Sequence, residues 1–246
     1  ANIFAKNHIP YGIGDQLFYF EMLLKNKLKL KFIDVLGEDR TTILIENFNP
    51  GIRKIIQSKN IKIGVLLTEF LDFDEQSRLL INSEYLLEDR SYIKNMKQRF
   101  GELVKLLPNI NYFITLFNCP EAKIVRKLFP TIPIYNLCRW PEFELMIPKI
   151  FEYDFCFFGS PTPFRNNILE EISKRHKLVA NHGISKEERT KLINQSKFVL
   201  NIPQTDNWTQ ASPMRILSAH NEGRHIIDIS HNTNIYPGVY TINSVD

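Results

Sequence analysis

The chain has 246 residues, of which 43% are hydrophobic and 24% charged, and its formal net charge is +4. This globular composition excludes a disordered, collagen-like or low-complexity chain, and the length predicts one or two domains. The small basic excess argues against an extended nucleic-acid-binding face but permits a small anionic ligand.

Cysteine usage and hydropathy predict the compartment. The three cysteines, at positions 119, 138 and 156, form no CxxC pair and no cluster with histidine, so we expect reduced thiols in a cytoplasmic protein. No apolar run reaches the roughly 18 residues that a spanning helix needs. We therefore expect at most peripheral membrane association, at the inner face of the membrane.

Strands alternate with helices in the first half of the chain. The apolar, β-rich runs predict strands at residues 2–5, 30–35, 42–46, 62–67, 112–116 and 134–136. Helical periodicity predicts helices at residues 14–25, 50–58 and 91–107, the last ending before Pro108. This alternation indicates βαβ units and a mainly parallel sheet, in an N-terminal Rossmann-like domain over residues 1–140.

The second half repeats this organisation after a proline-containing connector at residues 139–150. Strands are predicted at residues 153–158, 177–180, 198–202 and 226–229. The helices between them begin at the capping residues Thr162, Ser185 and Ser212. Glu188 completes a capping box with Ser185, and Gly223 ends the last helix. This pattern predicts a second Rossmann-like domain over residues 141–246.

Ligands of open α/β sheets bind beyond the carboxyl ends of the strands. The candidate loops are residues 159–162, 181–183 and 204–212. In the first two, Gly159, Ser160 and His182 could contact a ligand, although each also suits a simple turn.

The third loop carries Gln204 and Asn207 and leads into the helix that begins after Ser212. Arg215 lies in the first turn of this helix, where the macrodipole favours anions over cations. One hypothesis is that backbone amides, Ser212 and Arg215 bind a phosphate or carboxylate. The alternative is that Arg215 packs its stem and pairs with an acid at the surface.

Two carboxylates in the first half are candidate general bases for an acceptor hydroxyl. Asp15 lies between the first strand and the first helix, and Glu69 follows the strand at residues 62–67. For each of them taken singly, helix capping or simple surface exposure is the more common explanation.

Several catalytic motifs are absent from the sequence. It contains no GxGxxG, GxxxxGK[ST], HExxH or GxSxG motif, which argues against dinucleotide oxidoreductases, P-loop hydrolases, zinc proteases and nucleophile-elbow hydrolases. We predict no metal site and no cofactor.

The second half resembles the C-terminal half of GT-B glycosyltransferases, in particular the spore-maturation (CgeB-like) branch and related bacterial surface-polysaccharide transferases. The resemblance covers residues 150–230. It is carried by Asp154-Phe-Cys-Phe-Phe-Gly-Ser160, Lys177-Leu-Val-Ala-Asn-His-Gly183, Lys197-Phe-Val-Leu-Asn-Ile202 and Ser212-Pro-Met-Arg-Ile-Leu-Ser-Ala-His-Asn-Glu-Gly223.

The resemblance implies an α/β fold with two Rossmann-like domains whose mainly parallel sheets face each other across a cleft. It implies a metal-independent glycosyltransferase of polysaccharide biosynthesis, with a nucleotide-sugar donor on the C-terminal domain and a glycan or lipid-linked acceptor on the N-terminal domain. Gly159, Ser160 and His182 would line the donor pocket, and Arg215 would neutralise the donor phosphates. The chain is short for this architecture, so we expect either a piece of a longer protein or a minimal enzyme.

A second hypothesis is a catalytically silent Rossmann-like module, or a partner-binding subunit of a larger transferase. Many retaining GT-B members carry an acid early in the last helix, where this chain has Ser-Pro-Met-Arg, and Glu222 is the only acid on this helix. This departure favours the silent module. A phosphate-handling enzyme on a flavodoxin-like sheet is a third hypothesis, and the missing phosphate-loop glycines argue against it.

Overall fold

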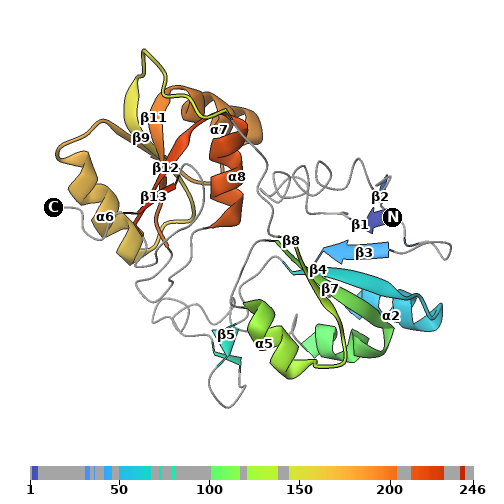
Figure 1. Ribbon diagram of the computed structural model, residues 1–246. Helices are drawn as coiled ribbons and strands as arrows, with labels where there is room; N and C mark the ends of the chain where they lie inside the picture. The colour runs from blue at the N-terminus through green and yellow to red at the C-terminus, as the bar shows by residue number, and fades with distance from the viewer. Residues whose placement is uncertain are drawn as a thin grey trace. The chain divides into compact units, whose positions relative to one another are not determined.

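The computed structural model is an α/β protein with two parallel sheets, one in each of two compact units (Figure 1). It describes residues 2–4, 31–33, 36, 42–45, 50–67, 72–73, 79–80, 101–116, 121–137, 144–203, 212–229 and 239–241. The described residues up to 137 belong to the first unit, and those from 144 onward to the second. The predicted boundary between residues 140 and 141 falls outside the described residues.

The first unit contains a six-stranded sheet in which every neighbouring pair is parallel, in the order β2-β1-β3-β4-β7-β8. Its strands are β1 (Asn2–Phe4), β2 (Lys31–Ile33), β3 (Thr42–Ile45), β4 (Ile63–Leu67), β7 (Ile110–Leu116) and β8 (Ile134–Leu137). A separate antiparallel pair joins β5 (Asp72–Phe73) to β6 (Leu79–Leu80). The parallel pairing confirms the βαβ organisation expected from the alternating pattern.

One face of this sheet forms a buried apolar core with its helices. Helix α2 (Pro50–Ser58) contributes Ile52 and Ile56, which join Val65 and Phe113 from the strands. Residues 101–106 are helical and end at η2 (Leu107–Asn109), where Pro108 cannot continue the α-helix. Helix α5 (Glu121–Leu128) adds Val125 to the same core.

The second unit contains a five-stranded, all-parallel sheet in the order β10-β9-β11-β12-β13. Its strands are β9 (Tyr153–Phe158), β10 (Leu178–Asn181), β11 (Ser196–Asn201), β12 (His225–Asp228) and β13 (Val239–Thr241). Its helices are α6 (Pro163–Ser173), α7 (Lys186–Asn194) and α8 (Pro213–Asn221). Counted in chain order, the strands are arranged 2-1-3-4-5, which is the flavodoxin-like form of the doubly wound α/β sheet.

Alternate side chains of β9 pack on opposite faces of this sheet, because successive residues of a strand point to opposite sides. Phe155 and Phe157 join the cluster that contains Ile168 of α6, whereas Cys156 joins the cluster that contains Ile216 of α8. Helices therefore cover both faces, with α6 on one side and α7 and α8 on the other (Figure 1). Burial raises the pKa of the free Cys156 thiol to about 12, which makes it an inert core residue.

The helix boundaries of the second unit confirm the predicted capping bonds of Thr162 and Ser185 and the predicted end of α8 at Gly223. Thr162 accepts a hydrogen bond from the backbone of the first turn of α6, and Ser185 and Glu188 form the complete capping box of α7. Gly223 ends α8 with a positive φ of 65°. No helix in the described part of the chain combines the length and apolarity that crossing a membrane requires.

Within the described chain, the strands β5, β6 and β13, the helix α5 and the 3-10 helix η2 were not predicted. Strand β11 also begins two residues earlier than expected, and β12 one residue earlier. The predicted helix at residues 14–25 and the start of the predicted helix at residues 91–107 lie outside the described residues.

We predict that Ser185→Ala lowers the free energy of unfolding by about 1 kcal/mol, because the Glu188 amide of α7 loses its acceptor. Chemical denaturation measures this change. Ser173→Ala is the control, since the Ser173 hydroxyl is exposed and bonds the Glu170 carbonyl of its own helix. Equal effects of the two substitutions would contradict the capping account.

Candidate functional site

The carboxyl ends of β9 and β11 form the topological switch point of the second sheet. From β9 the chain passes through α6 to β10 on one side, and through α7 it returns to β11 on the other side. The loops that leave β9 and β11 therefore separate in opposite directions. Open α/β sheets bind their ligands in the crevice that this separation creates.

Arg165 of α6 bridges the two diverging loops. Its Nε donates a hydrogen bond to the Ile202 carbonyl at 3.1 Å, and its Nη1 donates to the Ser160 carbonyl at 2.8 Å. The residue is only 4% exposed. A guanidinium is thus fixed at the switch point by main-chain acceptors from both sides.

Arg215 of α8 makes a second bridge between the same two strands. Its Nε donates to the Phe158 carbonyl at 3.1 Å, and its Nη1 donates to Asn201 Oδ1. Both guanidiniums lie over the Phe157 ring, with their Cζ atoms 5.3 Å (Arg165) and 5.1 Å (Arg215) from its centroid. Two cations therefore share one aromatic ring, at distances that permit cation–π attraction.

Gly159 lets the two guanidiniums approach the main chain. A Cβ at this position would lie 3.0 Å from Arg215 Nη2 and 3.2 Å from Arg165 Nη1. The same Cβ would lie 2.8 Å from Phe157 Cζ, so a side chain here would displace the Phe157 ring first and also crowd both guanidiniums. The glycine is therefore needed for the close approach of charge to the loop after β9.

Asn201 links this arrangement to the neighbouring strand. Its Nδ2 donates to Asp228 Oδ1 at 2.6 Å, and its Oδ1 also accepts from the Ser212 backbone N–H at 3.3 Å. Asn201 and Asp228 are both buried, at 1% and 0% exposure. The amide thus fixes Arg215, the start of α8 and the end of β12 in one hydrogen-bonded network.

The balance of charge among the two arginines and this network is positive. Among its described members, the guanidiniums of Arg165 and Arg215 accompany the carboxylate of Asp228. Burial, together with repulsion from Arg165, lowers the pKa of Arg215 to about 9, although Asp228 acts in the opposite direction. Two helix N-termini, those of α6 and α8, add partial positive charge. An anion bound here would relieve the repulsion, and phosphate matches guanidinium geometry well.

Four of the predicted site residues lie together at this edge of the sheet: Gly159, Ser160, Ser212 and Arg215. His182 follows β10 and is exposed, next to Gly183 with its positive φ of 69°. Asp15, Glu69, Gln204 and Asn207 lie outside the described residues.

Two details differ from expectation. The Ser212 side chain makes no capping bond to α8, and the backbone N–H of this residue donates to Asn201 Oδ1. Arg215 is half-buried, and its hydrogen bonds within the described residues go to a carbonyl and an amide oxygen. Within the described residues, neither of these hydrogen-bond partners is a surface carboxylate.

Sequence reasoning missed Arg165, Asn201 and Asp228. The signal for Arg165 was available, since this arginine also lies in the first turn of a helix that begins with proline. Asn201 and Asp228 are single polar residues at the ends of apolar strands. Their adjacency depends on the parallel register that places Asn201 opposite Asp228.

No protein-family model matches the chain, and no curated protein matches it. Among solved structures, the chain is similar to the β-glucosyltransferase of phage T4, with 14% identity, a TM-score of 0.47 and coverage of 95% of this chain and 84% of that one. A point mutant of the T4 phage enzyme in complex with UDP-glucose gives 13% identity, a TM-score of 0.47 and coverage of 94% and 82%. An α1,3-fucosyltransferase gives 12% identity, a TM-score of 0.38 and coverage of 93% and 68%.

We predict that binding of a small dianion weakens as the pH rises through about 9, because Arg215 carries its charge below this pKa and loses it above. Sulfate is a suitable probe, since its own charge is constant over this range. The rise in Tm that sulfate causes, at constant ionic strength, should be larger below this pKa than above it.

The control for this measurement is Arg215→Met, which keeps an apolar stem but removes the charge. The Tm rise of this variant should be small and the same on both sides of the pKa. An equal rise for the wild-type protein on both sides would contradict the assignment of the anion to Arg215.

Proposed function

We propose that the chain is a glycosyltransferase that moves a sugar from a nucleotide-sugar donor to a hydroxyl of a glycan or lipid-linked acceptor. The observation that carries this proposal is the pair of guanidiniums, Arg165 and Arg215, at the switch point of the second sheet. The resemblance of residues 150–230 to GT-B transferases supports the choice of a nucleotide-sugar among phosphate-containing ligands.

In this proposal the donor diphosphate lies against Gly159, Ser160 and the two guanidiniums. A diphosphate leaving group gains negative charge as the bond between the anomeric carbon and the phosphate oxygen breaks. Preorganised cations at that position stabilise the transition state more than the ground state. The two arginines supply this charge themselves, so the proposed step requires no metal ion.

The remaining predicted residues have proposed roles around the diphosphate. His182 follows β10 in the sequence, and Gln204 and Asn207 follow β11, the two strands that flank β9, and these residues would contact the nucleoside or the sugar. Asp15 or Glu69 would accept the proton of the acceptor hydroxyl while its oxygen attacks the anomeric carbon. The nucleoside diphosphate then leaves with the electron pair of the broken bond.

We predict that at least one of UDP, GDP, dTDP and CMP stabilises the protein against thermal unfolding. A ligand at a concentration about 100 times its Kd stabilises by about 2.7 kcal/mol. Arg165→Met and Arg215→Met should each weaken the binding of this nucleotide about 10- to 100-fold, because each loses a charge-assisted hydrogen bond to phosphate.

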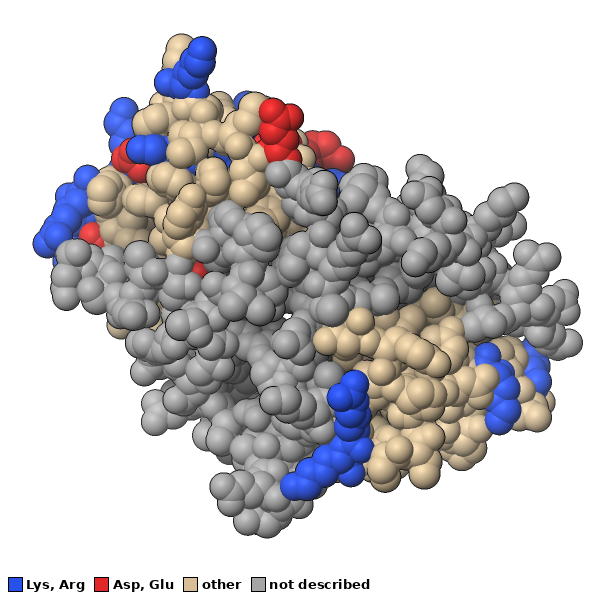
Figure 2. All heavy atoms as spheres, in the orientation of Figure 1, with Lys and Arg blue, Asp and Glu red and all other residues tan. Residues whose placement is uncertain are grey.

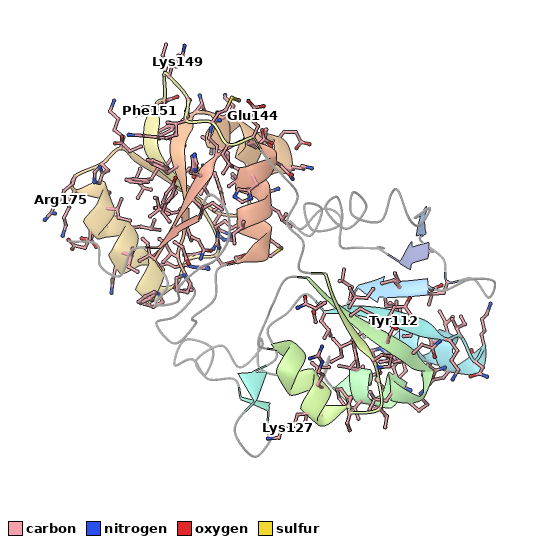
Figure 3. All side chains as sticks on the ribbon, viewed as in Figure 1. Tyr112, Lys127, Glu144, Lys149, Phe151 and Arg175 are labelled. Atoms are coloured by element: carbon pink, nitrogen blue, oxygen red, sulfur yellow. The ribbon has the colours of Figure 1, made fainter. Side chains whose placement is uncertain are left out.

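Arg175→Met is the matched control for this measurement. Arg175 belongs to the same unit but is exposed beyond the far end of α6 (Figure 3). The nucleotide affinity of this variant should equal that of the wild-type protein. Absence of stabilisation by all four nucleotides, or equal loss in the Arg175 variant, would overturn the donor site.

We predict that one of Asp15→Asn and Glu69→Gln lowers the rate of sugar transfer by about 10²- to 10⁴-fold, the contribution typical of a general base. The nucleotide-induced rise in Tm should remain in both variants, because neither carboxylate is assigned to the donor. A transfer assay with radiolabelled nucleotide-sugar and purified glycan acceptors measures the rate. Full activity in both variants would remove these residues from the mechanism.

A further inference from the structure

An exposed apolar loop, residues 146–151, lies at the amino edge of the second sheet. Its side chains are exposed by 56% at Met146, 49% at Ile147, 91% at Ile150 and 37% at Phe151. Four of the eight large hydrophobic side chains that are exposed in the described part of the chain thus lie within six consecutive residues. Such a concentration of apolar surface in one loop indicates an interaction site.

The ends of the apolar loop are firmly held to the second unit. The Met146 N–H donates to the Gly223 carbonyl at 2.7 Å, and Arg224 Nη1 donates to the Met146 carbonyl at 3.2 Å. On the other side, the Glu152 N–H donates to the Gln195 carbonyl at 2.8 Å. Proline at position 148 restricts the backbone between these anchors. The loop is therefore held in place with its apolar side chains outside the core.

Lysines accompany the apolar side chains. Lys149 stands between Ile147 and Ile150 in the sequence, and Lys197 Nζ lies 5.5 Å from the centroid of the Phe151 ring. Figure 3 shows Lys149 at the tip of the unit with Phe151 beside it, and Figure 2 shows basic side chains projecting at the same end. The neighbouring carboxylate of Glu152 accepts a hydrogen bond from Gln195 Nε2 at 3.0 Å.

We propose that the apolar loop inserts into the interface of an anionic lipid bilayer. A convex apolar protrusion such as Ile150 enters the region between headgroups and acyl chains, while lysines beside it reach back to anionic headgroups. A protein partner would need a wider complementary surface than one six-residue loop provides. The combination of aliphatic tip and flanking ammonium groups therefore favours a lipid surface.

The position of the loop suits such an attachment. It precedes β9, whereas the arginine pair lies beyond the carboxyl end of the same strand. A six-residue strand separates the two edges by about 20 Å. Membrane contact through the loop would therefore leave the switch point open to water. This inference stands independently of the proposed function.

Vesicle co-sedimentation tests the proposal, with phosphatidylcholine vesicles alone and with about 30% phosphatidylglycerol added. The wild-type protein should bind the anionic vesicles, and less strongly at high salt because the lysine contribution is screened. Ile150→Asp and Lys149→Glu should each lower this binding at least tenfold, whereas Ile150→Leu should retain it. The controls are Ile55→Asp and Lys54→Glu, at exposed positions of α2, which should bind like the wild-type protein.

Two outcomes would overturn the proposal: no binding to either vesicle, or binding that Ile150→Asp leaves unchanged. Sedimentation velocity tests a third outcome. If the wild-type protein is a dimer that does not bind vesicles, and Ile150→Asp dissociates this dimer, the loop binds a second copy of the chain and the membrane proposal is wrong. The nucleotide-induced rise in Tm should be the same in the loop variants and the wild-type protein. Failure of the membrane proposal is thereby distinguished from failure of the proposed function.

Discussion

The side-chain amide of Asn201 is the contact on which the carboxyl edge of the second sheet depends. Its nitrogen donates to Asp228, and its oxygen accepts from Arg215 and from the backbone of Ser212. One buried amide thereby connects β11 to β12 and to the start of α8. Through Arg215 it also reaches the carbonyl of Phe158 at the end of β9. The position of Arg215 at the switch point follows from this network, whereas Arg165 is held by the carbonyls of Ser160 and Ile202.

The same network holds like charges close together at a cost to stability. Arg165 and Arg215 both lie over the ring of Phe157. Repulsion from Arg165 lowers the pKa of Arg215, and the carboxylate of Asp228 raises it. Main-chain carbonyls satisfy donors of both guanidiniums but do not neutralise their charge. Local conflicts of this kind persist mainly at functional sites, where a ligand resolves them. An anionic ligand is the simplest resolution that the chemistry allows.

Much of the second unit was predictable because its local signals agree with one another. The capping residues Thr162 and Ser185 and the terminating Gly223 mark the helix ends. The strands between these helices are apolar, which predicts a sheet covered by helices on both faces. The cation at position 215 was identified from its unfavourable place in the helix dipole. That argument needs only the position of Arg215 in the first turn of a helix, and the sequence itself gives this position.

The rest depended on information that is not local. Asn201 and Asp228 are 27 residues apart, and only the parallel register of β11 and β12 places them together. Strand β13 is three residues long, so its existence depends on pairing with β12. Helix α5 is the exception, since its amphipathic pattern is clear, but it spans only eight residues, fewer than an isolated helix needs to be stable. Tertiary contacts decide such elements, and sequence patterns record them poorly.

A crystal structure of the protein with bound UDP tests the central claim most directly. The account predicts the diphosphate at the carboxyl ends of β9 and β11, with phosphate oxygens about 3 Å from the guanidinium nitrogens of Arg165 and Arg215 and from the backbone of Gly159 and Ser160. A diphosphate bound elsewhere on the chain, with both arginines still hydrogen-bonded as described and no anion between them, would contradict it.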